Sequence, residues 1–236
     1  MGATMKQTLS QGLPGLGLAL PDSAQDTLCA FGEAVVEQNK VMNLTAITEP
    51  EQVAKLHLLD SLTVLRCADL AGKTVIDVGC GAGFPGVPVK IACPEAQVTL
   101  LDSLGKRMNW LEQILPQLGV EAKCITARAE EAVTACREQY DVATSRAVAR
   151  LNILLELTAP YVKVGGKVLA MKGAAAQEEL AEALYVSRTA VSKWESGRGY
   201  PSIDSLKEIS RYFSVTIDDL LSGEQLKCVL PTSVAD

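Results

Sequence analysis

The chain has 236 residues, of which 48% are hydrophobic and 21% are charged, and this is the composition of a globular protein rather than of a disordered one. No apolar run reaches the length of about eighteen residues that a membrane-spanning helix needs, and the first residues lack the pattern of a secretory signal. We therefore expect a cytoplasmic protein with no membrane partner. The formal net charge of −6 argues against tight, non-specific binding to nucleic acid.

The cysteines and the histidine limit the possible chemistry. Seven cysteines are scattered along the chain with no CxxC pair, and His57 is the single histidine. This pattern predicts reduced thiols and no metal site. It also makes a hydrolase of the Ser-His-Asp or Cys-His type a poor interpretation.

The first predicted elements are two helices. Hydrophobic spacing predicts a helix over residues 23–39, which Asp22 or Ser23 can cap. A second helix is predicted over residues 49–70, where Thr48 and Glu51 have the spacing of a capping box.

Short strands rich in β-branched residues then alternate with helices. The expected strands span residues 74–79, 98–102, 123–127, 141–145 and 167–171, and helices between them include 106–115 and 151–159. This alternation predicts an α/β fold with a doubly wound parallel sheet, which binds ligands beyond the carboxyl ends of its strands. Four further short helices are expected at 177–184, 187–196, 202–213 and 216–221.

A glycine-rich loop follows the first strand. It reads DVGCGAGFPG from Asp77 to Gly86, and Asp102 ends the second strand. Glycines permit a tight turn and a close approach of ligand to backbone, and a carboxylate at Asp102 can accept hydrogen bonds from ribose hydroxyls. The loop contains GxGxxG, which also fits a dinucleotide oxidoreductase but is weak on its own. The longer pattern DxGxGxG resembles the S-adenosylmethionine loop of class I methyltransferases, and an ordinary glycine turn is the remaining interpretation.

Further motifs occur in order along the chain. They are NLTAIT from Asn43, HLLDSL from His57, IDVGCGAGFPGVPVKI from Ile76, LLDSLGKRMNWLE from Leu100, RAEE from Arg128, SRAVARL from Ser145 and AMKG from Ala170. Together they resemble the RsmG (GidB) family of bacterial methyltransferases over about residues 22–180. The resemblance implies a class I S-adenosylmethionine-dependent fold. It also implies methyl transfer to N7 of a guanine in the 16S rRNA of the small ribosomal subunit, at about nucleotide 527 in the family.

The resemblance also implies site residues. Cofactor contacts are expected at Gly79, Gly81, Gly83, Phe84, Asp102, Ala129, Glu130 and Arg146. Ser145 and Arg146 are the expected catalytic residues, and Asn43 and Lys172 are expected to face the RNA. Because guanine N7 carries a lone pair and no proton, it needs no general base, and catalysis reduces to positioning and electrostatics.

Two of these positions, and also the pair of His57 and Asp60, have a structural interpretation. Phe84 is also a candidate core residue, and Glu130 is also a candidate for a solvated helix start. His57 and Asp60 are spaced i and i+3 on a helix, and we expect them to bond each other and to tie the N-terminal helices to the sheet.

The last part of the chain carries a different pattern. From Gln177 it reads QEELAEALYVSRTAVSKWESGRGYPS, and it resembles a helix-turn-helix of the Cro/C1 (Xre) type over about residues 177–221. The resemblance implies a recognition helix with Ser187 as N-cap, and it places Trp194 in the core. The implied DNA-facing residues are Gln177, Ser187, Arg188, Thr189, Ser192 and Lys193. Residues 174–236 hold six basic and ten acidic side chains, which predicts weak DNA binding or none.

Both resemblances depart from their families where they meet. The string EELAEA fits both families, the first repressor helix is missing, and the last two methyltransferase strands are missing. The sheet is therefore expected to end in an open edge at residues 167–171, which is an aggregation hazard. The chain reads as a fusion, with a helical extension over 1–72, a cofactor-binding core over 73–176, a partial helix-turn-helix over 177–222 and a tail over 223–236. The alternatives are a DNA-binding regulator with a degenerate methyltransferase part, and a chain that folds poorly and does neither.

Overall fold

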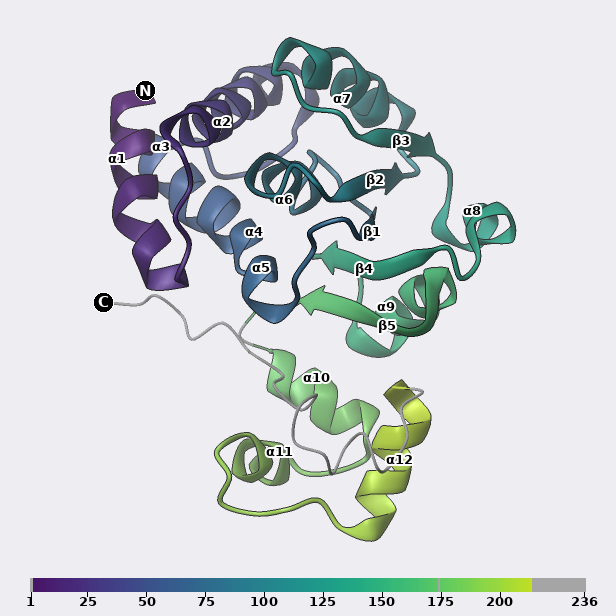
Figure 1. Ribbon diagram of the computed structural model, residues 1–236. Coiled ribbons are helices and arrows are strands. Elements are labelled where there is room, and N and C mark those ends of the chain that lie inside the picture. Colours follow the sequence, from purple (N-terminus) through teal and green to yellow (C-terminus); the bar gives the residue numbers. More distant parts are fainter. Residues whose placement is uncertain (1, 174, 214–236) are drawn as a thin grey trace. The chain divides into compact units, whose positions relative to one another are not determined.

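The computed structural model describes residues 2–173 and 175–213 (Figure 1). The chain forms two compact units: Met1–Val148 with Leu155–Met171, and Ala149–Leu154 with Lys172–Asp236. The predicted helix over 216–221 and the predicted tail over 223–236 lie outside the described residues. Within the described ranges, no helix is both long and apolar enough to cross a membrane.

The N-terminal unit begins with a helix that the sequence analysis did not predict. Helix α1 spans Gly2–Gly12 and is followed by the short 3₁₀ turn η1, Leu13–Leu16. Met5, Leu9 and Leu13 repeat at every fourth position, and all three are buried. This spacing is the helical signal that the sequence analysis missed.

The next helices extend those that were predicted. Helix α2 spans Asp22–Met42, and a helical run follows as α3 (Pro50–Val53), the π-helical turn η2 (Ala54–Leu59), α4 (Asp60–Leu62) and α5 (Val64–Cys67). Helix α1 approaches α2 closely. A Cβ atom built at Gly32 of α2 would lie only 2.8 Å from Sδ of Met5 in α1.

The caps predicted for these two N-terminal helices are wrong. The N-cap positions of α2 and α3 are occupied by Pro21 and Glu49. Neither helix start has a hydrogen bond to a capping side chain. Glu51 instead forms an ion pair with Lys55 at 2.8 Å. A lysine four residues further along the helix offers the carboxylate a charged donor, and this pairing replaces the capping box.

The sheet has the predicted doubly wound arrangement. Its strands are β1 (Thr74–Val78), β2 (Gln97–Asp102), β3 (Lys123–Thr126), β4 (Tyr140–Arg146) and β5 (Val162–Met171). All pairings are parallel, in the order β3-β2-β1-β4-β5. The carboxyl ends of β1, β2 and β4 are therefore neighbours, and this edge is where such a sheet binds ligands.

Helices cover both faces of the sheet (Figure 1). They are α6 (Gly86–Ala92), α7 (Gly105–Gln117), α8 (Ala129–Cys136) and α9 (Leu151–Thr158), with the 3₁₀ turn η3 (Ala159–Tyr161). Side chains alternate along the strands, so Val75 and Leu100 join the larger core with the N-terminal helices. Ile76 and Leu101 point to the other face and join a smaller core with Tyr161.

The last strand is an edge strand, as predicted. Among the described residues, β5 pairs only with β4. It also begins five residues before the predicted start, and Val164 in this added part is 96% exposed. After Met171 the described residues form helices and no strand.

The C-terminal unit contains three of the predicted helices. They are α10 (Ala176–Ala183), α11 (Arg188–Glu195) and α12 (Ile203–Phe213). Their shared core is small, with Leu184 and Ile209 buried and Trp194 packed against them. The prediction that Trp194 belongs to the core is thereby confirmed.

Leu9→Ala should lower the free energy of unfolding by about 2–5 kcal/mol, because it leaves a cavity where α1 contacts the rest of the core. Chemical denaturation measures this change. Gln7→Ala is the matched control, since Gln7 is exposed on the same helix, and it should alter stability by less than about 0.5 kcal/mol. Equal stability of the two variants would show that α1 does not contribute to the core.

Candidate functional site

The glycine loop is held between the carboxyl ends of β1 and β2. Gly79, Gly81 and Gly83 have φ values of 72°, 58° and 95°, a left-handed conformation that favours glycine. The amides of Gly79 and Cys80 donate to Leu101 O at 2.8 and 3.1 Å. A Cβ atom built at Gly81 would meet no atom of the described residues within 4 Å, apart from its chain neighbours, so the space above this residue is open.

Asp102 ties the loop to the second strand. One carboxylate oxygen accepts from the Gly81 amide at 2.9 Å, and the other accepts from the Leu104 amide at 2.8 Å. Each oxygen of a carboxylate has a second lone pair, so the side chain keeps acceptor capacity for a hydroxyl. Binding of ribose by Asp102 stays a prediction.

Asp77 is a site residue to which the sequence analysis gave no role. Its side chain is fully buried at the end of β1, and Oδ2 accepts from the Gly86 amide at 2.8 Å. Burial raises the pKa of Asp77 to about 7, while the Gly86 amide and the charge of Arg146 act in the opposite direction. Within the described residues Oδ1 has no hydrogen-bond partner. The first residue of the DxGxGxG pattern thus anchors the start of α6.

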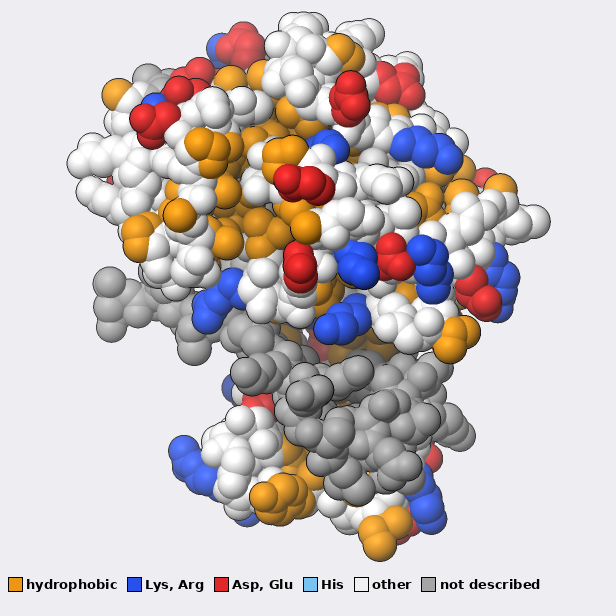
Figure 2. All heavy atoms as spheres, viewed as in Figure 1, with side chains coloured by type: hydrophobic (Ala, Val, Ile, Leu, Met, Phe, Trp, Pro, Cys, Tyr) orange, Lys and Arg blue, Asp and Glu red, His pale blue; other side chains and the backbone are white. Residues whose placement is uncertain are grey.

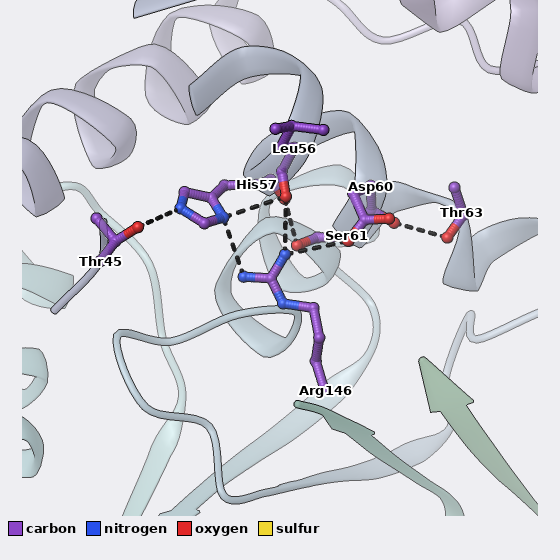
Figure 3. Close-up of polar contacts among 7 residues, drawn as sticks. All are labelled: Thr45, Leu56, His57, Asp60, Ser61, Thr63 and Arg146. Atoms are coloured by element: carbon purple, nitrogen blue, oxygen red, sulfur yellow. Dashed lines mark hydrogen bonds and ion pairs between the residues drawn. The ribbon is translucent and has the colours of Figure 1, made fainter. Parts of the chain in front are cut away.

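Arg146 ends β4 and extends to the N-terminal helices (Figure 3). Its Nη1 donates to Leu56 O at 3.0 Å and to Asp60 Oδ2 at 3.1 Å. Its Nη2 lies 3.2 Å from Nδ1 of His57. The guanidinium carbon lies 5.0 Å from the centre of the Phe84 ring, which is a cation–π distance.

Phe84 is a core residue that also contacts the candidate site. Only 5% of it is exposed, and its ring packs 5.2 Å from that of Phe31. It also stacks on the ring of His57, with centres 4.8 Å apart and planes inclined by 22°. The structural interpretation of Phe84 is therefore confirmed, and its contact with the cofactor stays a prediction.

His57 is the centre of the polar contacts in Figure 3. Its Nε2 lies 2.7 Å from Thr45 Oγ1, and its Nδ1 lies 3.1 Å from Leu56 O. Burial, and to a smaller extent the charge of Arg146, lower the pKa of His57 to about 4. Among the described residues, no hydrogen bond or ion pair joins the side chains of His57 and Asp60, so the predicted side-chain bond between them is wrong. Both residues bond Arg146 instead, because the guanidinium offers each of them a donor.

Ser145, the other predicted catalytic residue, has a buried hydroxyl. It donates to Val78 O at 2.7 Å and so joins β4 to β1. The structure thus gives Ser145 a structural bond, and its catalytic role stays a prediction.

The third strand end carries Ala129 and Glu130 in the first turn of α8. Glu130 accepts from Arg128 Nε at 2.6 Å on the protein surface. A backbone hydrogen bond and then Arg128 hold the pKa of Glu130 below its usual value. Ala129 O accepts from the Tyr161 hydroxyl. Glu130 is thus a solvated helix start, and contact of this turn with a cofactor stays a prediction.

The two predicted RNA-facing residues differ in exposure. Asn43 is exposed at the end of α2, with a left-handed φ of 50°. In the C-terminal unit, the Lys172 side chain is only 12% exposed, donates to Ala149 O, and pairs with Glu179 at 2.7 Å. Contact with RNA stays a prediction for both residues, and for Lys172 it requires that an internal ion pair opens.

The predicted DNA-facing residues lie on α11 and at the start of α10. Ser187 is the N-cap of α11, as predicted, and accepts from the Ala190 amide. Arg188, Thr189, Ser192 and Lys193 are exposed on α11. Gln177 instead bonds Glu195 within the unit at 2.7 Å. Their role toward DNA stays a prediction.

Acidic and basic side chains are interspersed on the face of the molecule shown in Figure 2. The described part of this face therefore carries no continuous basic surface of the kind that binds nucleic acid without sequence preference.

Comparisons with known proteins relate both parts of the chain to families. Residues 24–195 match the family described as rRNA small subunit methyltransferase G, and residues 176–220 match a helix-turn-helix family. The chain is 40% identical over 226 residues to the ribosomal RNA small subunit methyltransferase G of Alkaliphilus metalliredigens, covering 94% of this chain and 91% of that protein. It is 47% identical over 173 residues to the protein of the same name from Caldanaerobacter subterraneus, covering 71% and 72%. Among solved structures, precorrin-6y C5,15-methyltransferase from Geobacter metallireducens aligns with a TM-score of 0.44 and 13% identity, over 60% of this chain and 73% of that one.

The depressed pKa of His57 predicts a pH-dependent stability. Between pH 6.5 and 4 the unfolded chain binds a proton at His57 that the folded chain does not bind, so the free energy of unfolding falls as pH falls through this window. Urea denaturation at pH 7 and pH 4.5 should show a loss in the wild type that exceeds the loss in His57→Asn by about 2 kcal/mol. The comparison cancels the contribution of the carboxyl groups that both proteins share. Equal losses in the two proteins would contradict a depressed pKa at His57.

Proposed function

Since the chain belongs to the rRNA small subunit methyltransferase G family, we propose that it transfers a methyl group from S-adenosylmethionine to N7 of a guanine in 16S rRNA. The observation that supports the proposal is that three strands end side by side at the carboxyl edge of the sheet. The glycine loop follows β1, Asp102 ends β2 and Arg146 ends β4, and these strands are neighbours in the sheet. The proposal therefore places cofactor and target base at the carboxyl edge of the sheet.

The residues at this edge fit a nucleoside cofactor. Three glycines of the loop hold left-handed conformations, and the space above Gly81 is open to a ligand. Asp102 keeps lone pairs for ribose hydroxyls, and Ala129 with Glu130 is proposed to line the adenine end. When bound, S-adenosylmethionine supplies a methyl group on a positively charged sulfur.

The proposed chemistry explains why the site needs no general base. The N7 lone pair forms the new bond to the methyl carbon while the sulfur–carbon bond breaks, and no proton moves. The chain has to align the reactants and to avoid an unfavourable field at the positively charged sulfur. The charge of Arg146 is balanced by Asp60 at 3.1 Å. Arg146 is therefore proposed to position cofactor and base without adding an unpaired positive charge, while Asn43 faces the RNA.

A second candidate function is binding of DNA by α11. The match to a helix-turn-helix family and the exposed row of Arg188, Thr189, Ser192 and Lys193 favour it. The excess of acidic residues in the same part of the chain opposes it.

Arg146→Ala should lower the rate of methyl transfer by about 100-fold, because the side chain that positions the cofactor and the base is lost. Transfer of tritium from methyl-labelled S-adenosylmethionine to small ribosomal subunits that lack the modification measures this rate. Arg137→Ala is the control, since the Arg137 side chain is 64% exposed and its one ion pair among the described residues is with its neighbour Glu138. Turnover of Arg146→Ala equal to that of the control would remove Arg146 from the site.

For the second candidate, we expect the full chain to retard duplex DNA weakly and only at low salt, for lack of phosphate contacts. A gel-shift titration at several salt concentrations tests this. Sequence-specific binding at physiological salt that Arg188→Ala abolishes would establish the helix-turn-helix as a DNA-binding module. Lys207→Ala is the control, because Lys207 lies on α12 and its side chain is 64% exposed.

A further inference from the structure

Arg146 receives its acceptors from a single turn of the N-terminal helices (Figure 3). Leu56 and His57 lie in the π-helical turn η2, and Asp60 follows it directly. The contacts to Leu56 O, Asp60 Oδ2 and His57 Nδ1 use three of the five N–H donors of the guanidinium. Among the described residues, no further acceptor bonds to Arg146. Two donors therefore remain for a ligand.

The geometry distinguishes two proton arrangements on His57. In one, Nδ1 carries the proton and donates to Leu56 O at 3.1 Å, and Nε2 accepts from the Thr45 hydroxyl. In the other, Nδ1 is the acceptor for Nη2 of Arg146 at 3.2 Å, and Nε2–H donates to Thr45 Oγ1 at 2.7 Å. A guanidinium can only donate hydrogen bonds. In the first arrangement the Nδ1–H donor of His57 therefore faces the Nη2–H donor of the permanently charged Arg146. The second arrangement leaves Nδ1 and Leu56 O as two acceptors 3.1 Å apart, but both can accept from the same positively charged guanidinium, so it is the favourable one.

The surroundings keep His57 in the neutral form that can accept. The residue is 9% exposed and its ring stacks on Phe84. Among the described residues, the charged groups that face it are Arg146 and, across that guanidinium, Asp60. Burial and the charge of Arg146 hold the pKa of His57 near 4, far below neutral pH. Thr45 is in turn fixed, because its hydroxyl oxygen also accepts from the Ile47 amide at 3.0 Å.

We propose that His57 is a positioning residue for methyl transfer, in which Thr45 holds the neutral Nε2–H tautomer so that Nδ1 orients the guanidinium of Arg146. The proposal rests on the proposed function for its kinetic consequence. The orientation itself does not depend on that function. It gives the single histidine of the chain a role that involves no proton transfer.

The proton arrangement can be measured directly, because the single histidine removes any assignment problem. Nuclear magnetic resonance of the wild-type full chain, labelled with ¹⁵N in histidine, reports the protonation of both ring nitrogens. We expect Nε2 protonated and Nδ1 unprotonated throughout pH 6 to 8, with the Nδ1 signal displaced in Arg146→Ala. A protonated Nδ1, or averaged signals from two tautomers, would overturn the proposal.

Two substitutions at His57 test the role of the Nδ1 acceptor separately from the volume of the ring. An asparagine at 57 places an amide oxygen near the position of Nδ1, whereas a glutamine places its amide near the position of Nε2. With small ribosomal subunits as substrate, kcat of His57→Gln should fall by about 10-fold to 100-fold, through loss of one charge-assisted hydrogen bond. His57→Asn should exceed His57→Gln in kcat by about tenfold or more, and both should bind S-adenosylmethionine with wild-type affinity within about threefold.

Equal kcat values for the two variants would overturn the positioning role, whether both match the wild type or both fall. A wild type that methylates no ribosomal subunit would instead overturn the proposed function, and the resonance experiment would still decide how His57 and Arg146 are bonded. The two failures are therefore distinguishable.

Discussion

A buried guanidinium needs acceptors on every side that it turns to the protein, and this need at Arg146 shapes the candidate site. Its side chain is only 18% exposed, and leaving such a charge unpaired costs several kcal/mol. The acceptors come from a backbone carbonyl, a carboxylate and a neutral imidazole within five consecutive residues. A π-helical turn occurs at this point of an otherwise α-helical run, as such turns often do at functional sites. The same contacts connect the N-terminal helices to the end of β4, so this side chain contributes both to the site and to the packing of this unit.

The sequence was sufficient to predict the sheet but not the contacts that cross it. Runs of β-branched residues and the glycine loop located all five strands and their parallel arrangement, because these features are local. Helix α1 was missed because only every fourth residue of it, such as Met5 and Leu9, is apolar and buried. The bond expected between His57 and Asp60 was wrong because the competing partner lies 86 residues from Asp60 in sequence. Local spacing cannot indicate such a partner, whereas the NLTAIT and HLLDSL motifs did contain Thr45, His57 and Asp60.

The segment where the two family resemblances overlap contributes to both kinds of structure. Helix α10 lies within both matches, residues 24–195 and residues 176–220. Glu179 of this helix accepts from the Leu151 amide and forms an ion pair with Lys172. Both Leu151 and Lys172 belong to the methyltransferase motifs. On the other side, Leu180 packs against Leu184 in the core of the helix-turn-helix. One amphipathic helix thus meets the packing requirements of both families. This is the physical reason why a string such as EELAEA can belong to both family matches at once.

The central claim is that the glycine loop and the ends of β2 and β4 form a working cofactor site. Thermal unfolding of the full chain with and without S-adenosylmethionine tests it most directly. A ligand at one hundred times its dissociation constant adds about 2.7 kcal/mol of stability if it binds the folded state alone. The account predicts a cooperative transition whose midpoint rises with cofactor concentration. A cooperative transition whose midpoint stays the same at every concentration would contradict it.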